Sequence, residues 1–165
     1  MSAQIVALKP RKSSRRSMPV RRPNVNLRTR EYLTPSEVAK LMTVAGKRSR
    51  YGQRDACLIL LGYRHGLRVS ELVALKWDQA DLKAGLLHVR RAKNGTPSTD
   101  PLQGDELRAL RQLAREWPDH GGFVFISERG GPMSTDGVRK MITRTGEEAK
   151  LPFPVHPHRS EGAHV

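Results

Sequence analysis

Hydrophobic positions after Thr34 recur at the spacing of one helical face. They are Val38, Leu41, Met42 and Ala45. The preceding Thr34-Pro35-Ser36-Glu37 has the form of a capping box with proline at the first helical position. Gly46 follows as an expected helix end. The pattern therefore predicts an amphipathic helix between Thr34 and Gly46.

Further helices follow along the chain. Residues 56–63 are apolar on nearly every side, which predicts a buried helix that ends at Gly66. A short helix over 69–75 comes next, and apolar positions from Leu107 to Trp117 trace a third amphipathic face. Ser134 can cap a last long helix.

Between these helices the period changes to that of strands. Residues 86–90 are β-prone, and Asn94-Gly95 favours a tight hairpin turn. The return run over 96–102 contains two prolines, so it should be an edge strand. Residues 123–126 form a short strand or a buried segment. The predicted fold class is mainly α with a small antiparallel β-sheet (α+β).

Positive charge dominates the composition, with 30 Lys and Arg against 16 Asp and Glu and a formal net charge of +14. Before Glu31, the first acidic residue, stand nine cations interleaved with prolines: Lys9, Arg11, Lys12, Arg15, Arg16, Arg21, Arg22, Arg28 and Arg30. We expect residues 1–30 to be a basic disordered arm that contacts phosphates, and residues 31–165 to form the domain. The alternative is a merely solvating tail.

Nucleic acid is the leading partner for this charge, because cations set against phosphates release counterions. No segment is long and apolar enough for a membrane span. The single cysteine, Cys57, lies in an apolar run and suits a reducing cytoplasm. An acid-free, Arg- and Ser-rich start is also typical of an organelle transit peptide. We expect no cofactor and no metal site, since His156, His158 and His164 have only Glu161 nearby.

The segment Gly66-Leu67-Arg68-Val69-Ser70-Glu71-Leu72 carries the candidate chemistry. It places Arg68 at a turn between two helices, with Glu71 one helical turn later. An arginine held by a carboxylate is pre-oriented, and its planar fork can bind two oxygens of one phosphate. The alternative is a helix-capping arginine in a surface ion pair with Glu71.

This segment, followed by Leu75-Lys76-Trp77, resembles the first signature box of the tyrosine recombinase or phage integrase family. The resemblance covers about residues 31–158 and is strongest to short bacterial integrases such as fimbrial switch invertases. It implies the catalytic domain of DNA breaking and rejoining enzymes, C-terminally incomplete. It also implies double-stranded DNA as partner, strand exchange through a phosphotyrosyl intermediate, and a tetramer on DNA.

The resemblance assigns roles to individual residues. Arg68 matches the first catalytic arginine, and Glu71 would orient it. Lys93 matches the hairpin lysine, the general acid for the departing 5′ oxygen, although Arg90 or Arg91 could be confused with it. His158 matches the histidine of the family's His-x-x-Arg motif. Arg68 and Lys93 should therefore converge on one backbone phosphate.

The sequence departs from the family pattern after His158. Three residues on stands Glu161 in place of the second arginine, and Arg159 would point away from the phosphate. The only tyrosines, Tyr32, Tyr51 and Tyr63, precede the first box or lie beside it. We expect a chain that binds duplex DNA and whose catalysis is either lost or dependent on residues absent from this sequence; the sequence does not decide whether the chain still assembles as a tetramer. A non-catalytic DNA-binding regulator is the alternative, and an RNA-binding protein is disfavoured because the few aromatic residues fall at core spacing.

Overall fold

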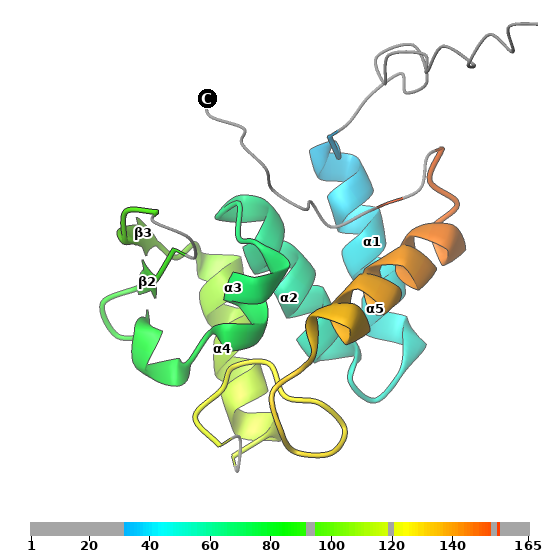
Figure 1. Cartoon of the computed structure of the whole chain (residues 1–165). Helices are drawn as coiled ribbons and strands as arrows, with labels where there is room; N and C mark the ends of the chain where they lie inside the picture. The colour runs from blue at the N-terminus through cyan, green and yellow to red at the C-terminus, as the bar shows by residue number, and fades with distance from the viewer. Residues whose placement is uncertain (1–31, 92–94, 119–120, 153–154, 156–165) are drawn as a thin grey trace, which may run out of the picture. The chain divides into compact units, whose positions relative to one another are not determined.

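The computed structural model describes residues 32–91, 95–118, 121–152 and 155. Its helices are α1 (Pro35–Arg48), α2 (Gly52–Arg64), α3 (Val69–Ala74), the 3₁₀ turn η2 (Trp77–Gln79), α4 (Gly104–Glu116) and α5 (Thr135–Glu148). Strands β1 (Ala80–Asp81), β2 (Leu86–Val89) and β3 (Ser98–Pro101) form one antiparallel sheet in the order β1-β2-β3. The predicted class, mainly α with a small antiparallel sheet, is confirmed (Figure 1).

Helix α1 begins where the sequence predicts and ends later. The Thr34 hydroxyl accepts from the Glu37 amide at 3.4 Å, and the Glu37 carboxylate accepts from the Thr34 amide at 2.8 Å. The predicted end at Gly46 is wrong, because α1 continues to Arg48. A helical glycine costs only about 1 kcal/mol relative to alanine. The basic residues Lys47 and Arg48 also stabilise the extra turn, because cations interact favourably with the negative C-terminal end of the helix dipole.

The hairpin pairs β2 with β3, with Leu87 opposite Asp100 and Val89 opposite Ser98. As predicted, β3 is an edge strand, and a proline, Pro101, stands at its end. The two-residue strand β1 was not predicted, because two residues are too few to show an alternating pattern. Its pairing with β2 extends the sheet on the other edge.

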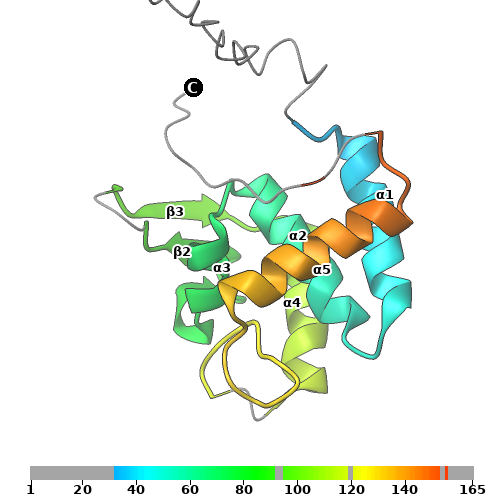
Figure 2. The ribbon, with the colours of Figure 1, turned by 45° about the vertical axis from the view of Figure 1, so that its right-hand side comes forward.

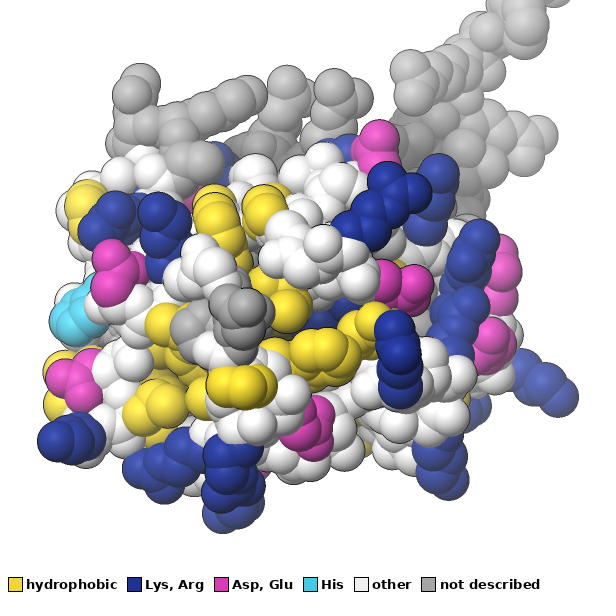
Figure 3. Space-filling model, turned by 90° about the horizontal axis from the view of Figure 1, so that it is seen from below, with side chains coloured by type: hydrophobic (Ala, Val, Ile, Leu, Met, Phe, Trp, Pro, Cys, Tyr) yellow, Lys and Arg dark blue, Asp and Glu magenta, His cyan; other side chains and the backbone are white. Residues whose placement is uncertain are grey.

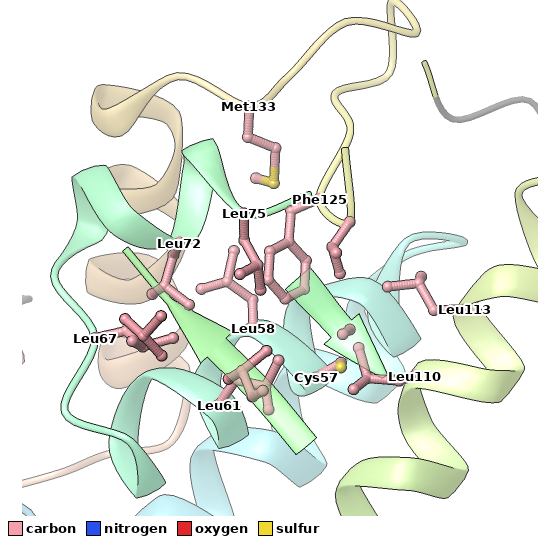
Figure 4. Packing of buried hydrophobic residues seen from close by; sticks show 14 of the residues in the cluster. Cys57, Leu58, Leu61, Leu67, Leu72, Leu75, Leu110, Leu113, Phe125 and Met133 are labelled. Carbon is pink, nitrogen blue, oxygen red and sulfur yellow. The ribbon is translucent and has the colours of Figure 1, made fainter. Parts of the chain in front are cut away.

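The main core surrounds α2 (Figure 4). Leu58 and Leu61 of α2 are fully buried, as are Leu110 of α4 and Phe125. Phe125 lies in the segment predicted as a strand or a buried segment. In the structure residues 124–126 are buried, and the segment makes isolated bridges to Lys76 and Pro132 instead of forming a named strand. Cys57 is buried with them, and this burial raises the pKa of its thiol to about 12. The thiol is therefore a core side chain rather than a nucleophile at neutral pH.

Helix α5 packs against α1 and α3 and crosses in front of α2 in the turned view (Figure 2). Its N-cap is Ser134, whose hydroxyl accepts from the Gly137 amide at 3.0 Å, as the sequence predicts. A second cluster joins α1 to the α5 end through Leu41, Ile59 and Ala149. Residues 66–68, between α2 and α3, thus connect two well-packed helices.

Candidate functional site

The turn after α2 is set by a glycine. Gly66 has φ of 58°, a left-handed conformation that L residues with side chains rarely adopt. The Leu67 amide then donates to the Gly62 carbonyl at 3.1 Å, which is the long bond of a Schellman motif. Leu67 itself is buried. These features fix the direction in which the chain leaves α2 toward Arg68.

Arg68 is the residue immediately before α3 and is only partly exposed. Its carbonyl accepts from the amides of Glu71 at 3.0 Å and Leu72 at 2.9 Å. In return, the buried Glu71 carboxylate accepts from the Arg68 amide at 2.9 Å. Glu71 was predicted to orient the Arg68 side chain, and the hydrogen bond described here joins its carboxylate to the Arg68 main-chain amide. The carboxylate fixes the main chain from which the arginine side chain projects.

Arg91, just beyond β2, reaches back to the same turn. Its Nη2 donates to the His65 carbonyl at 3.3 Å, and its Nη1 lies 3.4 Å from both the Gly66 carbonyl and the Glu71 carboxylate. In the sequence, Arg91 is visible only as a residue that could be confused with Lys93. No local signal could have found its partners, because they lie 20 to 26 positions away along the chain.

The other side of the turn is held by α4. The Nε2 atom of His65 lies 2.9 Å from Oε1 of Glu106, a carboxylate that is 0% exposed. The Gln103 amide donates to the other oxygen of Glu106 at 2.7 Å, and Arg64 Nη1 lies 3.3 Å from it. A buried carboxylate requires such donors, since an unpaired one would cost several kcal/mol. Glu106 therefore joins the end of α2 to the start of α4.

An open hollow of about 350 Å³ lies beside these contacts, lined by Arg64, His65, Arg91, Asp100, Pro101 and Gln103. Its charges largely offset one another. Arg64 donates to both oxygens of Asp105, at 2.6 and 2.9 Å, and this hydrogen bonding lowers the pKa of the Asp105 carboxyl. The arginines that line the hollow are thus already paired with carboxylates, so the hollow is not a ready site for an anion.

Of the predicted site residues, the structure describes Arg68 and Glu71 and brings them together. Lys93, His158 and the nine cations of the arm lie outside the described residues. Within the described ranges, no group of His, Cys, Asp and Glu could hold a metal ion, and no helix could cross a membrane.

Two of the three tyrosines are exposed, and the third is packed away. Tyr32 and Tyr63 are the large exposed hydrophobic side chains of the described chain. Tyr51 is buried, its ring stacks on Trp117 with centroids 5.1 Å apart, and its hydroxyl accepts from Arg50 at 2.6 Å. A hydroxyl held in this way is not available to attack a phosphate.

Cations on the face seen from below are spread rather than gathered. Figure 3 shows Lys and Arg side chains around the rim of this face, with hydrophobic side chains near its middle and Asp or Glu among them. Such a distribution gives a general attraction to polyanions. It does not by itself locate a binding surface, so the local geometry at Arg68 carries more weight than the net charge.

Comparison with known proteins shows which family and which solved structures the chain resembles. The model of the phage integrase family matches residues 31–160. The type 1 fimbriae regulatory protein FimE of Escherichia coli (strain K12) is 40% identical over 134 residues, which are 78% of this chain and 67% of FimE. The chain thus spans about two thirds of the length of this relative.

Solved structures share the fold. The XerA recombinase superposes with a TM-score of 0.68 at 23% identity, covering 78% of this chain and 46% of that one. A lambda integrase structure described as bound to DNA has a TM-score of 0.58 at 25% identity, covering 76% of this chain and 45% of that one. In both, the matched part is less than half of the longer protein.

Proposed function

We propose that this chain, which belongs to the phage integrase family of tyrosine recombinases, binds duplex DNA and holds one backbone phosphate at Arg68. The observation that carries the proposal is the fixed turn that presents Arg68. Gly66 sets its direction, and the Glu71 carboxylate holds the Arg68 amide. The net charge of +14 supports attraction to DNA, and a lambda integrase of similar fold is described as DNA-bound.

The chemistry of Arg68 suits a phosphodiester. A guanidinium can donate two parallel hydrogen bonds to non-bridging oxygens, whose negative charge increases when phosphorus becomes five-coordinate. Family resemblance adds Lys93 as the acid that protonates the departing 5′ oxygen and His158 as a further donor. We propose that these residues converge on the phosphate held by Arg68.

Strand exchange in the family requires a tyrosine oxygen that bonds to phosphorus while the 5′ oxygen leaves. Tyr51 is buried and stacked, and the other tyrosines, Tyr32 and Tyr63, precede the first box. We therefore propose that none of these three tyrosines forms the covalent link, and that the site at Arg68 holds the phosphate non-covalently. The second candidate function is a DNA-binding regulator that occupies recombination sites. Because DNA is its proposed partner, we place it in the cytoplasm.

The phosphate contact is tested by the salt dependence of DNA binding. Arg68→Ala should weaken binding of a labelled duplex and reduce the slope of log affinity against log salt by about 0.9, the value for one lost phosphate contact. Arg115→Ala, at an exposed position near the end of α4, is the matched control for loss of one charge. An unchanged slope for Arg68→Ala, with a folded protein, would contradict the proposal.

The arm is tested in the same assay. Removal of residues 1–30 should reduce the slope by several multiples of 0.9, because the segment carries nine cations. An unchanged slope would show that the arm only solvates the chain.

Covalent chemistry is tested separately with a nicked suicide duplex. The proposal predicts no protein–DNA adduct on a denaturing gel, with an intact family recombinase on its own site as the positive control. An adduct would overturn the non-covalent function and support strand cleavage by this chain.

A further inference from the structure

We infer that Arg91 is a positioning residue. It sets the direction of Arg68 through hydrogen bonds to the turn from which Arg68 projects. The inference rests on the proposed phosphate contact at Arg68. Arg91 lies just past the end of β2, so it connects the sheet to the turn between α2 and α3. The family resemblance mentions this residue only as one that could be confused with Lys93, and gives it no positioning role.

A single guanidinium, that of Arg91, makes all the contacts to the turn. Its two terminal nitrogens reach the carbonyls of two consecutive residues, His65 and Gly66, at 3.3 and 3.4 Å. Nη1 also lies 3.4 Å from the Glu71 carboxylate. Each distance is long for a hydrogen bond, but the guanidinium is planar and presents all three contacts together. The carbonyls stand at the C-terminal end of α2, where the helix dipole favours a cation.

These contacts act on the main chain before Arg68 and on the amide of Arg68 itself. Arg91 holds the carbonyls two and three positions before it, and Glu71 holds the Arg68 amide. The Glu71 carboxylate oxygen that accepts from Arg68 is the same atom that faces Arg91. A change at Arg91 therefore alters both the turn and the carboxylate that fixes the start of α3.

The turn cannot simply follow Arg91 if that residue moves. On its other side, the His65 ring is fixed by the fully buried Glu106, at 2.9 Å. Leu67 is buried in the main core. Loss of the Arg91 contacts should thus loosen one side of a turn that remains anchored on the other, and this changes where Arg68 points.

Arg91 is better placed to brace the turn than to contact phosphate itself. Its side chain is 27% exposed, and its charge faces the buried carboxylate of Glu71. Its neighbour Arg90 is exposed and has the same charge. This pair lets a single experiment separate a positioning effect from a general effect of charge next to the hairpin.

The test measures salt-dependent binding of the full chain to a labelled duplex, for Arg91→Lys and Arg91→Ala, each with and without Arg68→Ala. Lysine keeps the charge but presents its donors from a single nitrogen, so it cannot reproduce contacts that Arg91 makes from two separate nitrogens. We expect both Arg91 variants to reduce the log-log slope by up to about 0.9, the contribution of one phosphate. In the Arg68→Ala background we expect no further reduction. Arg90→Lys should leave the slope unchanged, and any effect of Arg90→Ala should be the same in both backgrounds.

Each outcome is decisive. Full binding by Arg91→Lys would overturn the inference, because charge alone would then suffice. Arg91 effects that persist undiminished after Arg68→Ala would also overturn it, since Arg91 would be an independent contact. If Arg68→Ala alone has no effect, the proposed phosphate contact fails instead. Where Arg91→Ala does not fold, Arg91→Lys decides, together with faster amide hydrogen exchange of Arg68 as the expected structural sign.

Discussion

Two regions of the molecule hold α2 in different ways. Along its length, α2 packs by apolar contact, with Leu58 and Leu61 fully buried against Leu110 and Phe125. At its C-terminal end it is held by a polar junction, which we define as His65, Arg68, Glu71, Arg91 and Glu106. The stabilisation from apolar contact is roughly proportional to the apolar area that is buried, and it does not depend on direction. The polar junction depends on direction, so it can aim a side chain.

This difference indicates that the two regions have separate roles. The core should determine whether the domain folds, whereas the junction should determine where Arg68 points. Substitutions in the two regions should therefore separate stability from DNA binding. The following changes test that separation, beginning with the largest expected loss of stability.

Phe125→Ala should produce the largest effect, a loss of about 3–5 kcal/mol in the free energy of unfolding, because it opens a cavity in the main core. Urea denaturation followed by circular dichroism measures it. Leu82→Ala, at a partly buried position of the same cluster, should cost clearly less. Equal losses for the two variants would mean that full burial of Phe125 adds nothing over the partial burial of Leu82.

Glu106→Gln should cost about 1–3 kcal/mol, because the amide cannot accept from the Gln103 amide, His65 and Arg64 as the carboxylate does. The same denaturation experiment measures this loss. Glu116→Gln, at an exposed position of the same helix, is the control and should change stability by less than about 0.5 kcal/mol. If Glu106→Gln is as stable as the parent chain, the junction contributes little to holding α2 and α4 together.

The comparison also explains what could be predicted from the sequence. Local patterns determine the capping box at Thr34 and the glycine turn at Gly66, because their partners lie within a few residues. The pairing of β2 with β3 could also be predicted, because the two strands follow each other along the chain. The Arg68 box could be found in the same way, since its residues are contiguous. Gly46 misled the prediction because a helix tolerates a glycine when its other residues favour continuation.

The remainder of the site could not be predicted, for a physical reason. Arg91 and Glu106 are charged residues that lie 20 to 41 positions away from Glu71 and His65, the partners that connect them to the turn. In the sequence, Arg91 looks like any cation next to a hairpin, and Glu106 looks like an acid in the first turn of a helix. Only the packing of α2 against α4 and the sheet shows that they surround one turn.

Gly66→Ala should cost about 1–2 kcal/mol, because a side chain at φ of 58° strains the main chain even though no atom lies within 4 Å of the added carbon. Gly46→Ala is the matched control: it also meets no atom within 4 Å, but it lies in the helical interior of α1. It should stabilise the chain by about 0.4–1 kcal/mol. Thermal unfolding of both variants measures the contrast, and the same sign for both would refute the role of the left-handed turn.

Asp105→Asn should have the smallest effect, about 0.2–1 kcal/mol, because its ion pair with Arg64 is partly exposed. The two hydrogen bonds from Arg64 lower the pKa of Asp105 below its ordinary value of 3.8. The carboxylate therefore stabilises the fold fully above about pH 4. This contribution is lost as the pH falls through the lower pKa of the folded state.

The difference in stability between parent and Asp105→Asn should thus be constant from pH 5 to about pH 7 and shrink below pH 3.8, as measured by urea denaturation across pH. Asp136→Asn is the control, because Asp136 is more exposed and makes a single 3.1 Å contact with Arg139. Its cost should be smaller at every pH. A cost for Asp105→Asn that stays the same at low pH would show that the asparagine disturbs packing rather than removing a charge. The Arg64–Asp105 pair, which lies beside the polar junction, would then contribute through its shape and not through its charge.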